Sequence, residues 1–151
     1  MKEVRDVMNN FEQVEPAQLE HLYLATGVTV SVDEILLPAP EAVTQIGSPL
    51  HVITAWNPGI ERPTDAINQE ANALLREDLR VLGDNVFPAI GKDPSSDHAE
   101  KSWAVTGISD ETAMALGAKY RQVAIFRLDA EHQTVLSCDG TWTRTRKFSE
   151  S

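Results

Sequence analysis

The sequence predicts an α+β domain built on a two-layer split βαβ sheet of the ferredoxin-like kind, with an added C-terminal strand and N-terminal helices. The elements expected between residues 51 and 126 follow the order strand, helix, strand, strand, helix, strand. Right-handed crossovers and short connections fold that order into one sheet with both helices on the same face. The alternative is a Rossmann-like three-layer α/β sheet. It requires a regular alternation of strands and helices, which the two consecutive strands interrupt.

Two short helices are expected before this core. In the first, apolar residues recur at helical spacing, at Val4, Val7, Met8 and Phe11. The second opens at Pro16 and ends before segment 28–32, whose alternating β-branched residues indicate a strand. The stretch around 38–49 is broken by prolines and a glycine and carries no strong period, so a connection is expected there.

The core begins with an apolar strand over 51–56. Thr64 is expected to cap the helix that follows, and Gly83 is expected to end it. This helix has an apolar stripe for packing, formed by Ile67, Ala71, Leu74, Leu75, Leu79 and Leu82.

Two consecutive strands come next, at 86–90 and 102–108, with a polar loop at 91–101 between them. Ser109 is expected to cap the second core helix. Strands at 123–126 and 134–137 then complete the predicted sheet.

Length and composition predict one cytoplasmic domain. The 151 residues are 42% hydrophobic, which suffices for a single core over 1–140, followed by a flexible tail at 141–151. Cys138 is the only cysteine, which fits a reducing compartment, and no stretch reaches the roughly 18 apolar residues of a membrane span. The formal charge of −10 disfavours nucleic acid as a partner. The expected tail holds the one local basic cluster, Arg144, Arg146 and Lys147.

Polar side chains gather where the 51–56 strand ends. Thr54 and Asn57 lie at this end, and Asn68 and Asn72 lie four residues apart on the nearest turns of the following helix. The four are expected to converge as ligand-binding residues, because amides offer donors and acceptors without charge. A structural role, in which the amides tie the loop to the helix, fits the pattern equally well.

The polar loop supplies the catalytic candidate. Asp93, Asp97, His98 and Glu100 fall within eight residues, and such a cluster can provide an acid and a base or ligate a cation. Glu100, just before a strand, is the predicted general base, and Asp93 is a predicted ligand-binding residue. Asp97 and His98 are weak metal candidates only, since no second imidazole or recognised spacing accompanies them, so no metal site is predicted. The sequence identifies no cofactor.

Ser102 and Gln122 complete the predicted set of ligand-binding residues. Ser102 opens the strand that follows Glu100. Gln122 follows a predicted helix and begins a strand, so its amide is expected either to cap the helix or to point into the same site.

Six short motifs occur in order along the chain: Ile53-Thr-Ala-Trp-Asn-Pro58, the pair Asn68 and Asn72, Gly91-Lys-Asp-Pro94, Glu100-Lys-Ser-Trp103, Gly107-Ile-Ser109 and Gln122-Val-Ala-Ile125. Through them the chain resembles the bacterial DUF3293 family, small proteins of uncharacterised function, over roughly 19–128. The chain departs from the family at Lys101, where proline is usual, and at Arg121, where glycine is common. The resemblance implies that these polar positions form one common site, and it names no substrate.

Two functional hypotheses follow. In the first, a polar pocket binds a small metabolite or nucleotide-like ligand, and Glu100 acts as general base if the protein is a hydrolase. In the second, the protein is a noncatalytic interaction or regulatory module that docks a protein partner or a second copy of itself. A concave pocket with ionisable groups favours the first, whereas a flat apolar patch or a free sheet edge favours the second. Neither nucleic acid nor a membrane is an expected partner.

Overall fold

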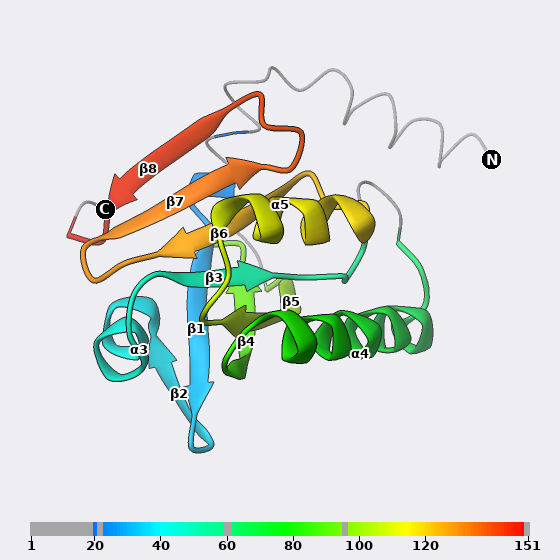
Figure 1. Cartoon of the computed structure of the whole chain (residues 1–151), viewed down its shortest axis with the longest axis horizontal. Helices are drawn as coiled ribbons and strands as arrows, with labels where there is room; N and C mark the ends of the chain where they lie inside the picture. Colours follow the sequence, from blue (N-terminus) through cyan, green and yellow to red (C-terminus); the bar gives the residue numbers. More distant parts are fainter. Residues whose placement is uncertain (1–19, 21–22, 59–61, 95–96, 150–151) are drawn as a thin grey trace.

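One curled antiparallel sheet organises the protein. The computed structural model describes residue 20 and residues 23–58, 62–94 and 97–149 (Figure 1). Its eight strands lie in the order β2-β1-β4-β5-β3-β6-β7-β8, and every neighbouring pair is antiparallel. The strands are β1 (Gly27–Val32), β2 (Ile35–Pro38), β3 (Leu50–Ile53), β4 (Val86–Lys92), β5 (Ala99–Val105), β6 (Ala124–Leu128), β7 (His132–Ser137) and β8 (Thr143–Lys147). The described helices are α3 (Ala39–Ile46), α4 (Asp65–Leu82) and α5 (Asp110–Lys119).

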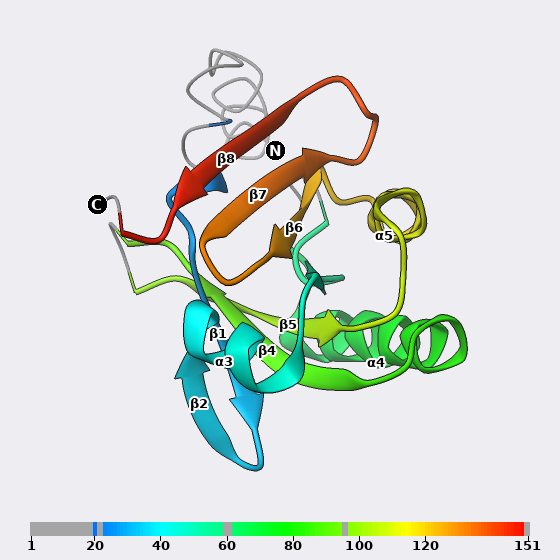
Figure 2. The same cartoon turned by 60° about the vertical axis from the view of Figure 1, so that its left-hand side comes forward.

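The predicted fold class was wrong, and so was its Rossmann-like alternative. The chain order from β3 to β6 is strand, helix, strand, strand, helix, strand, but the sheet continues past these four strands at both edges. β1 pairs with β4 and carries β2 beyond it, while β7 and β8 extend the other edge. Twisted strands accumulate curvature as their number grows. The result is a half-barrel rather than a flat two-layer sandwich (Figure 2).

The curl separates two apolar clusters. The inner cluster joins α3 to strands that are far apart in the sheet, from β1 through β4, β5 and β3 to β6, and α3 covers one end of it. The outer cluster packs α4 and α5 against the other face through residues such as Leu75, Leu79, Ala113 and Leu116. Helices therefore cover both faces of the sheet, which a two-layer fold does not allow (Figures 1 and 2).

The predicted helix ends are confirmed. Thr64 Oγ1 accepts a hydrogen bond from Ile67 N at 3.3 Å, and Ser109 Oγ accepts one from Thr112 N at 3.1 Å. Gly83 ends α4, with its N–H donating to Leu79 O at 2.8 Å. A Cβ at Gly83 would lie 2.5 Å from Val105 Cγ2, so the close approach of α4 to β5 also requires glycine there.

Three segments differ from expectation. The stretch taken as a connection contains β2 and α3, because its prolines stand at the start of a helix: Pro38 is the N-cap of α3 and Pro40 lies in the first turn. The loop expected at 91–101 is mostly a hairpin, since β4 extends to Lys92 and β5 begins at Ala99. The two helices expected before residue 26 lie largely outside the described residues.

The segment assigned to a flexible tail contributes β8 to the sheet. Arg146, in β8, donates through Nε to Leu24 O at 2.7 Å and through Nη2 to Gln133 Oε1 at 3.3 Å. Gln133 is fully buried and donates to Thr26 O at 2.8 Å. Arg144 pairs with the buried Glu20 at 2.7 Å. The basic cluster thus ties the chain ahead of β1 to the last strands.

Candidate functional site

A polar pocket of about 280 Å³ continues the inner face of the half-barrel beyond its apolar cluster. Alternate residues of each strand face inward, and near α3 these are apolar, such as Val52 in β3 and Ala104 in β5. One or two inward positions further along the same strands are Thr54, Ser102 and Glu100, all of which line the pocket. The change from apolar to polar along each inward row therefore creates the site.

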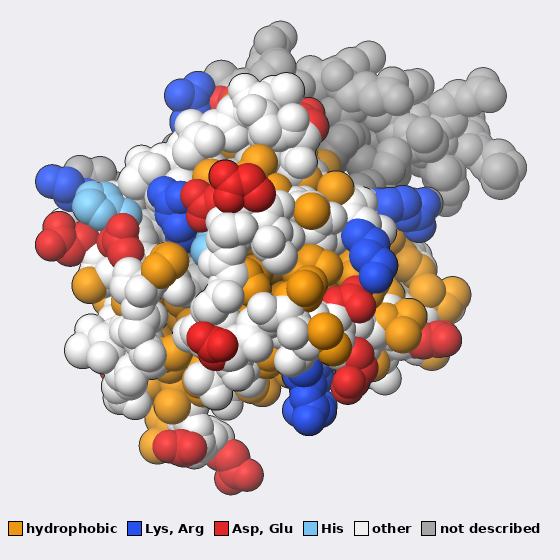
Figure 3. Space-filling view, in the orientation of Figure 1, with side chains coloured by type: hydrophobic (Ala, Val, Ile, Leu, Met, Phe, Trp, Pro, Cys, Tyr) orange, Lys and Arg blue, Asp and Glu red, His pale blue; other side chains and the backbone are white. Residues whose placement is uncertain are grey.

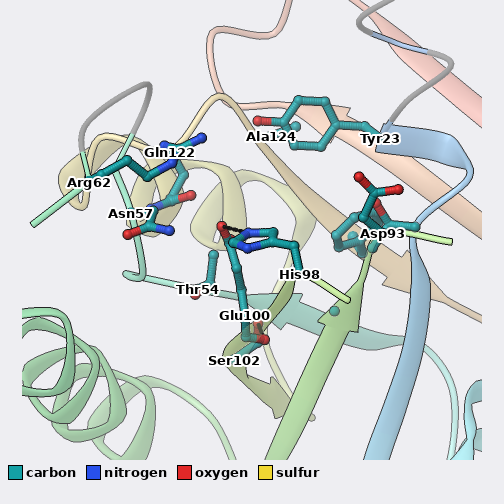
Figure 4. A pocket seen from close by; sticks show the side chains of 13 residues that line it. Tyr23, Thr54, Asn57, Arg62, Asp93, His98, Glu100, Ser102, Gln122 and Ala124 are labelled. Carbon is teal, nitrogen blue, oxygen red and sulfur yellow. Dashed lines mark hydrogen bonds and ion pairs between the residues drawn. The ribbon is translucent and has the colours of Figure 1, made fainter. Parts of the chain in front are cut away.

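Most of the predicted site residues meet in this pocket (Figure 4). The lining includes Thr54, Asn57, Asp93, His98, Glu100, Ser102 and Gln122. Asn68, Asn72 and Asp97 are not among its lining residues. The pocket also has walls that the sequence did not predict, formed by Tyr23, Thr26, Arg62, Gly91, Ala124 and Phe126. The inward alternation of β6 would have found Ala124 and Phe126, whereas no periodic pattern marks Arg62.

Asn68 fixes the position of Asn57. The side chain of Asn68 is buried, with an exposed fraction of 2%, and its Oδ1 accepts from Asn57 N at 2.9 Å. Its Nδ2 donates to Asn57 Oδ1 at 2.8 Å. Asn57 has a left-handed backbone with φ 48°, a conformation that asparagine tolerates better than most residues. Asn68 thus holds the pocket residue Asn57 in position without itself lining the pocket.

Asn72 holds the preceding turn of the same loop. Asn72 Oδ1 accepts from Ala55 N at 3.0 Å, and its Nδ2 donates to Lys101 O at 3.1 Å. Thr54 Oγ1 donates to the same carbonyl at 2.7 Å. The expected neighbourhood of Thr54, Asn57, Asn68 and Asn72 is therefore one hydrogen-bonded region, in which the two helical asparagines brace the loop.

Glu100 lies inside the pocket on β5, opposite Gly91 of β4. Its side chain is 26% exposed, and its Oε2 lies 3.0 Å from His98 Nε2. Figure 4 shows this pair near the middle of the pocket, with Asn57, Arg62 and Gln122 on one side and Asp93 on the other. An ionised carboxylate can only accept, so His98 Nε2 carries the hydrogen when Glu100 is charged. A carboxylate whose position is fixed by an imidazole in this way can accept a proton from a bound water molecule.

Tyr23 forms the wall above this pair. Its burial, followed by the negative charge of Glu100, raises the pKa of the phenol to about 12, although Arg62 acts in the opposite direction. The hydroxyl therefore keeps its proton at neutral pH and can donate to a bound molecule. Among the described residues, no three His, Cys, Asp or Glu side chains are grouped as a metal site would require.

Arg121 lies in the turn between α5 and β6. Its φ is 59°, in the left-handed region where glycine has no steric cost. The turn delivers Gln122 to the pocket, where its Nε2 donates to Trp56 O at 3.3 Å.

A second polar cluster lies on the outer face, away from the pocket. His51 is buried in β3, and its Nε2 lies 2.8 Å from Asp110 Oδ1 at the start of α5. Arg127 of β6 pairs with the other oxygen of Asp110. Burial alone would raise the pKa of Asp110, but the hydrogen bond from His51 and the charge of Arg127 outweigh it and hold the pKa below its usual range.

The surface shows no concentration of one charge on the face seen in Figure 3, where acidic and basic side chains are interspersed. Within the described ranges, no helix combines the length and apolar character of a membrane span.

Comparison with known proteins gives one family. A family model described as "Protein of unknown function (DUF3293)" matches residues 53–125, which confirms the resemblance over that region. The matched residues run from the end of β3 through α4, β4, β5 and α5 into β6, and so supply most of the pocket. Neither curated proteins nor solved structures give a match.

Proposed function

For a chain whose residues 53–125 match the DUF3293 family, we propose that the pocket binds a small polar metabolite and hydrolyses it with Glu100 as general base. The hydrogen-bonded pair of Glu100 and His98, inside a pocket that also offers the neutral amides of Asn57 and Gln122, carries this proposal. Glu100 takes a proton from a water molecule, whose oxygen adds to the electrophilic atom of the substrate. His98 holds the carboxylate in place, and the protonated Glu100 returns the proton to the leaving group.

The rest of the molecule supports a rigid site of this kind. The strands β4, β5 and β6, which carry many of the lining residues, are each hydrogen-bonded to a neighbouring strand on both sides. Asn68 and Asn72, both buried, fix the loop that carries Asn57. Sites held on strands and braced by a second layer of hydrogen bonds keep their geometry better than sites on free loops. The charge of −10 and the single cysteine support a cytoplasmic protein that does not bind nucleic acid.

The test is a thermal-shift screen of nucleotides, sugars, amino acids and divalent ions, followed by product analysis by NMR. Glu100→Gln keeps the side-chain shape and removes the base, so we expect it to abolish turnover and to weaken binding of the hit. The variant should melt within a few degrees of the parent, because among the described residues the side chain of Glu100 is hydrogen-bonded to His98 alone. Glu70→Gln, on the exposed face of α4, is the matched control and should change nothing. Full activity in Glu100→Gln would exclude the hydrolase mechanism.

A second candidate function is docking of a protein partner. Ile67, Leu74 and Val81 recur every seven residues on α4 and are 55%, 58% and 84% exposed. Such an exposed apolar stripe is typical of a helix that packs against another chain. Sedimentation equilibrium of the parent and of Leu74→Ser tests the case of a second copy. A concentration-dependent dimer that the substitution abolishes would favour this function, and a monomer in both would exclude the dimer.

A further inference from the structure

The two amides that line the pocket, Asn57 and Gln122, have fixed and opposite orientations. A backbone N–H can only donate, so the atom of Asn68 that faces Asn57 N is its oxygen. The nitrogen of Asn68 must then be the atom that faces the side chain of Asn57, and it donates to Asn57 Oδ1. This leaves Nδ2 as the remaining end of Asn57. The pocket side of Asn57 is therefore a hydrogen-bond donor.

The same logic gives Gln122 the opposite polarity. One end of its amide lies 3.3 Å from Trp56 O and 3.5 Å from Tyr120 O. Carbonyl oxygens only accept, so this end is Nε2, and Oε1 is left as an acceptor. Among the residues that the structure describes, none donates to Gln122 Oε1 and none accepts from Asn57 Nδ2.

The two groups are neighbours because both are anchored to one peptide unit. The peptide between Trp56 and Asn57 accepts from Gln122 through its oxygen and donates to Asn68 through its nitrogen. Both side chains line the same cavity, and Figure 4 shows them beside each other. The pocket thus presents a donor and an acceptor side by side, neither of which can reverse without breaking a bond to the backbone or to Asn68.

From this pairing we infer that the ligand carries a planar group with an acceptor and a donor on one edge, such as a primary carboxamide, a ureide or a lactam. This inference rests on the proposed function and names the substrate class of the same site. The ligand oxygen accepts from Asn57 Nδ2, and the ligand N–H donates to Gln122 Oε1. A carboxylate would place an oxygen against Gln122 Oε1, and an amidinium would place an N–H against Asn57 Nδ2. Both mismatches leave a polar atom facing a like atom, which lowers affinity.

Three matched probes test the inference: benzamide, benzoate and benzamidine, which share a ring and differ only in this edge. Their dissociation constants are measured with the full chain by ligand-observed NMR. We expect benzamide to bind most tightly to the parent protein. Asn57→Asp keeps Oδ1 for Asn68 and turns the pocket end into an acceptor. The preference for benzamide over benzamidine should then fall roughly tenfold or more.

Two further variants control for charge and folding. Asn85→Asp adds the same charge at an exposed residue outside the pocket and should leave the preference unchanged. Asn57→Ala removes the donor without adding charge, keeps the backbone bond to Asn68, and should reduce the preference for benzamide over benzamidine. It serves as the test if Asn57→Asp does not fold.

The outcomes separate this inference from the function on which it rests. An unchanged preference in both Asn57 variants, tightest binding of benzoate, which Arg62 would attract, or no binding of benzamide would each overturn the inference. If non-amide metabolites still bind in a Glu100-dependent manner, the proposed function stands without it. If Glu100→Gln alters neither binding nor turnover of any molecule, both fail.

Discussion

Asn57 and Asn68 are joined by two hydrogen bonds of opposite direction, from Asn57 N to Asn68 Oδ1 at 2.9 Å and from Asn68 Nδ2 to Asn57 Oδ1 at 2.8 Å. The pair connects the first turn of α4 to the loop after β3 across eleven residues of sequence. Both bonds use the side chain of Asn68. Because this side chain is buried, water cannot readily replace it as a partner of Asn57.

Replacing Asn68 should therefore destabilise the protein. In Asn68→Ala the backbone N–H of Asn57 and its side-chain oxygen both lose their partner, and we expect a loss of about 1–3 kcal/mol in the free energy of unfolding. Urea denaturation followed by circular dichroism measures it. Gln69→Ala, at the next and exposed position, should cost less than about 0.5 kcal/mol. Equal losses in the two variants would contradict the bracing role of Asn68.

The packing of α4 gives a second prediction. Leu75 is fully buried in the outer cluster, so Leu75→Ala should cost about 2–5 kcal/mol. Arg76 is exposed but lies over the ring of Trp103 at 5.3 Å, so Arg76→Ala should cost up to about 1 kcal/mol. The urea denaturation midpoints of the two variants, compared at equal dependence of the unfolding free energy on urea, distinguish these effects. Similar midpoints would show that the inner face of the helix is misassigned.

The cluster of His51, Asp110 and Arg127 predicts a dependence of stability on pH. The folded-state pKa of Asp110 is lowered, so its contribution is complete above the unfolded-state pKa of about 3.9 and is lost as pH falls through the folded-state value. At neutral pH, Asp110→Asn should be less stable than the parent by about 1 kcal/mol, a figure reduced for partial exposure.

That difference should shrink toward zero in acid, as Asp110 becomes protonated in the parent. Asp65→Asn is the matched control, because Asp65 also begins a helix but forms no ion pair within the described part of the chain. Its effect should be limited to about 0.3–1 kcal/mol from the helix dipole. Thermal unfolding of the three proteins across the acid range makes the comparison, and a constant gap between parent and Asp110→Asn at every pH would refute the assignment.

The last strand gives a fourth prediction. Arg146 bonds to Leu24 O and to the buried Gln133, so Arg146→Ala should lower the free energy of unfolding by about 1–3 kcal/mol. Replacing its exposed neighbour Lys147 with alanine should lower the free energy of unfolding by less than about 0.5 kcal/mol. Unfolding in guanidinium chloride provides both values. If Arg146→Ala were as stable as the parent, β8 would not anchor the segment ahead of β1.

Local patterns predicted the elements better than their assembly. The helix caps at Thr64 and Ser109 join residues only three positions apart, so they can be predicted from the local sequence. The pairing of Thr29 with Ile90 joins strands about sixty residues apart, and no local period encodes such a contact. The half-barrel arises from several such long-range pairings, so its curl was not predictable from the spacing of individual elements.

The site divides in the same way. Thr54, Asn57 and Glu100 were identified because polar side chains at the ends of apolar strands are visible in the sequence. The bracing role of Asn68 and Asn72 was one of two readings, and only the hydrogen bonds to Asn57, Ala55 and Lys101 distinguish them. Tyr23 was expected on the helix that opens at Pro16 and Arg62 in a loop, and both meet the pocket only through the folded chain.

The pocket lining spans the chain from Tyr23 to Phe126 and draws on β4, β5 and β6, so an occupied site cannot persist once these strands separate. Occupancy is therefore linked to global unfolding by mass action. A molecule present at a hundredfold excess over its dissociation constant would raise the free energy of unfolding by about 2.7 kcal/mol. Abundance in the cell would then rise and fall with the concentration of the metabolite, even where no regulator acts on the protein.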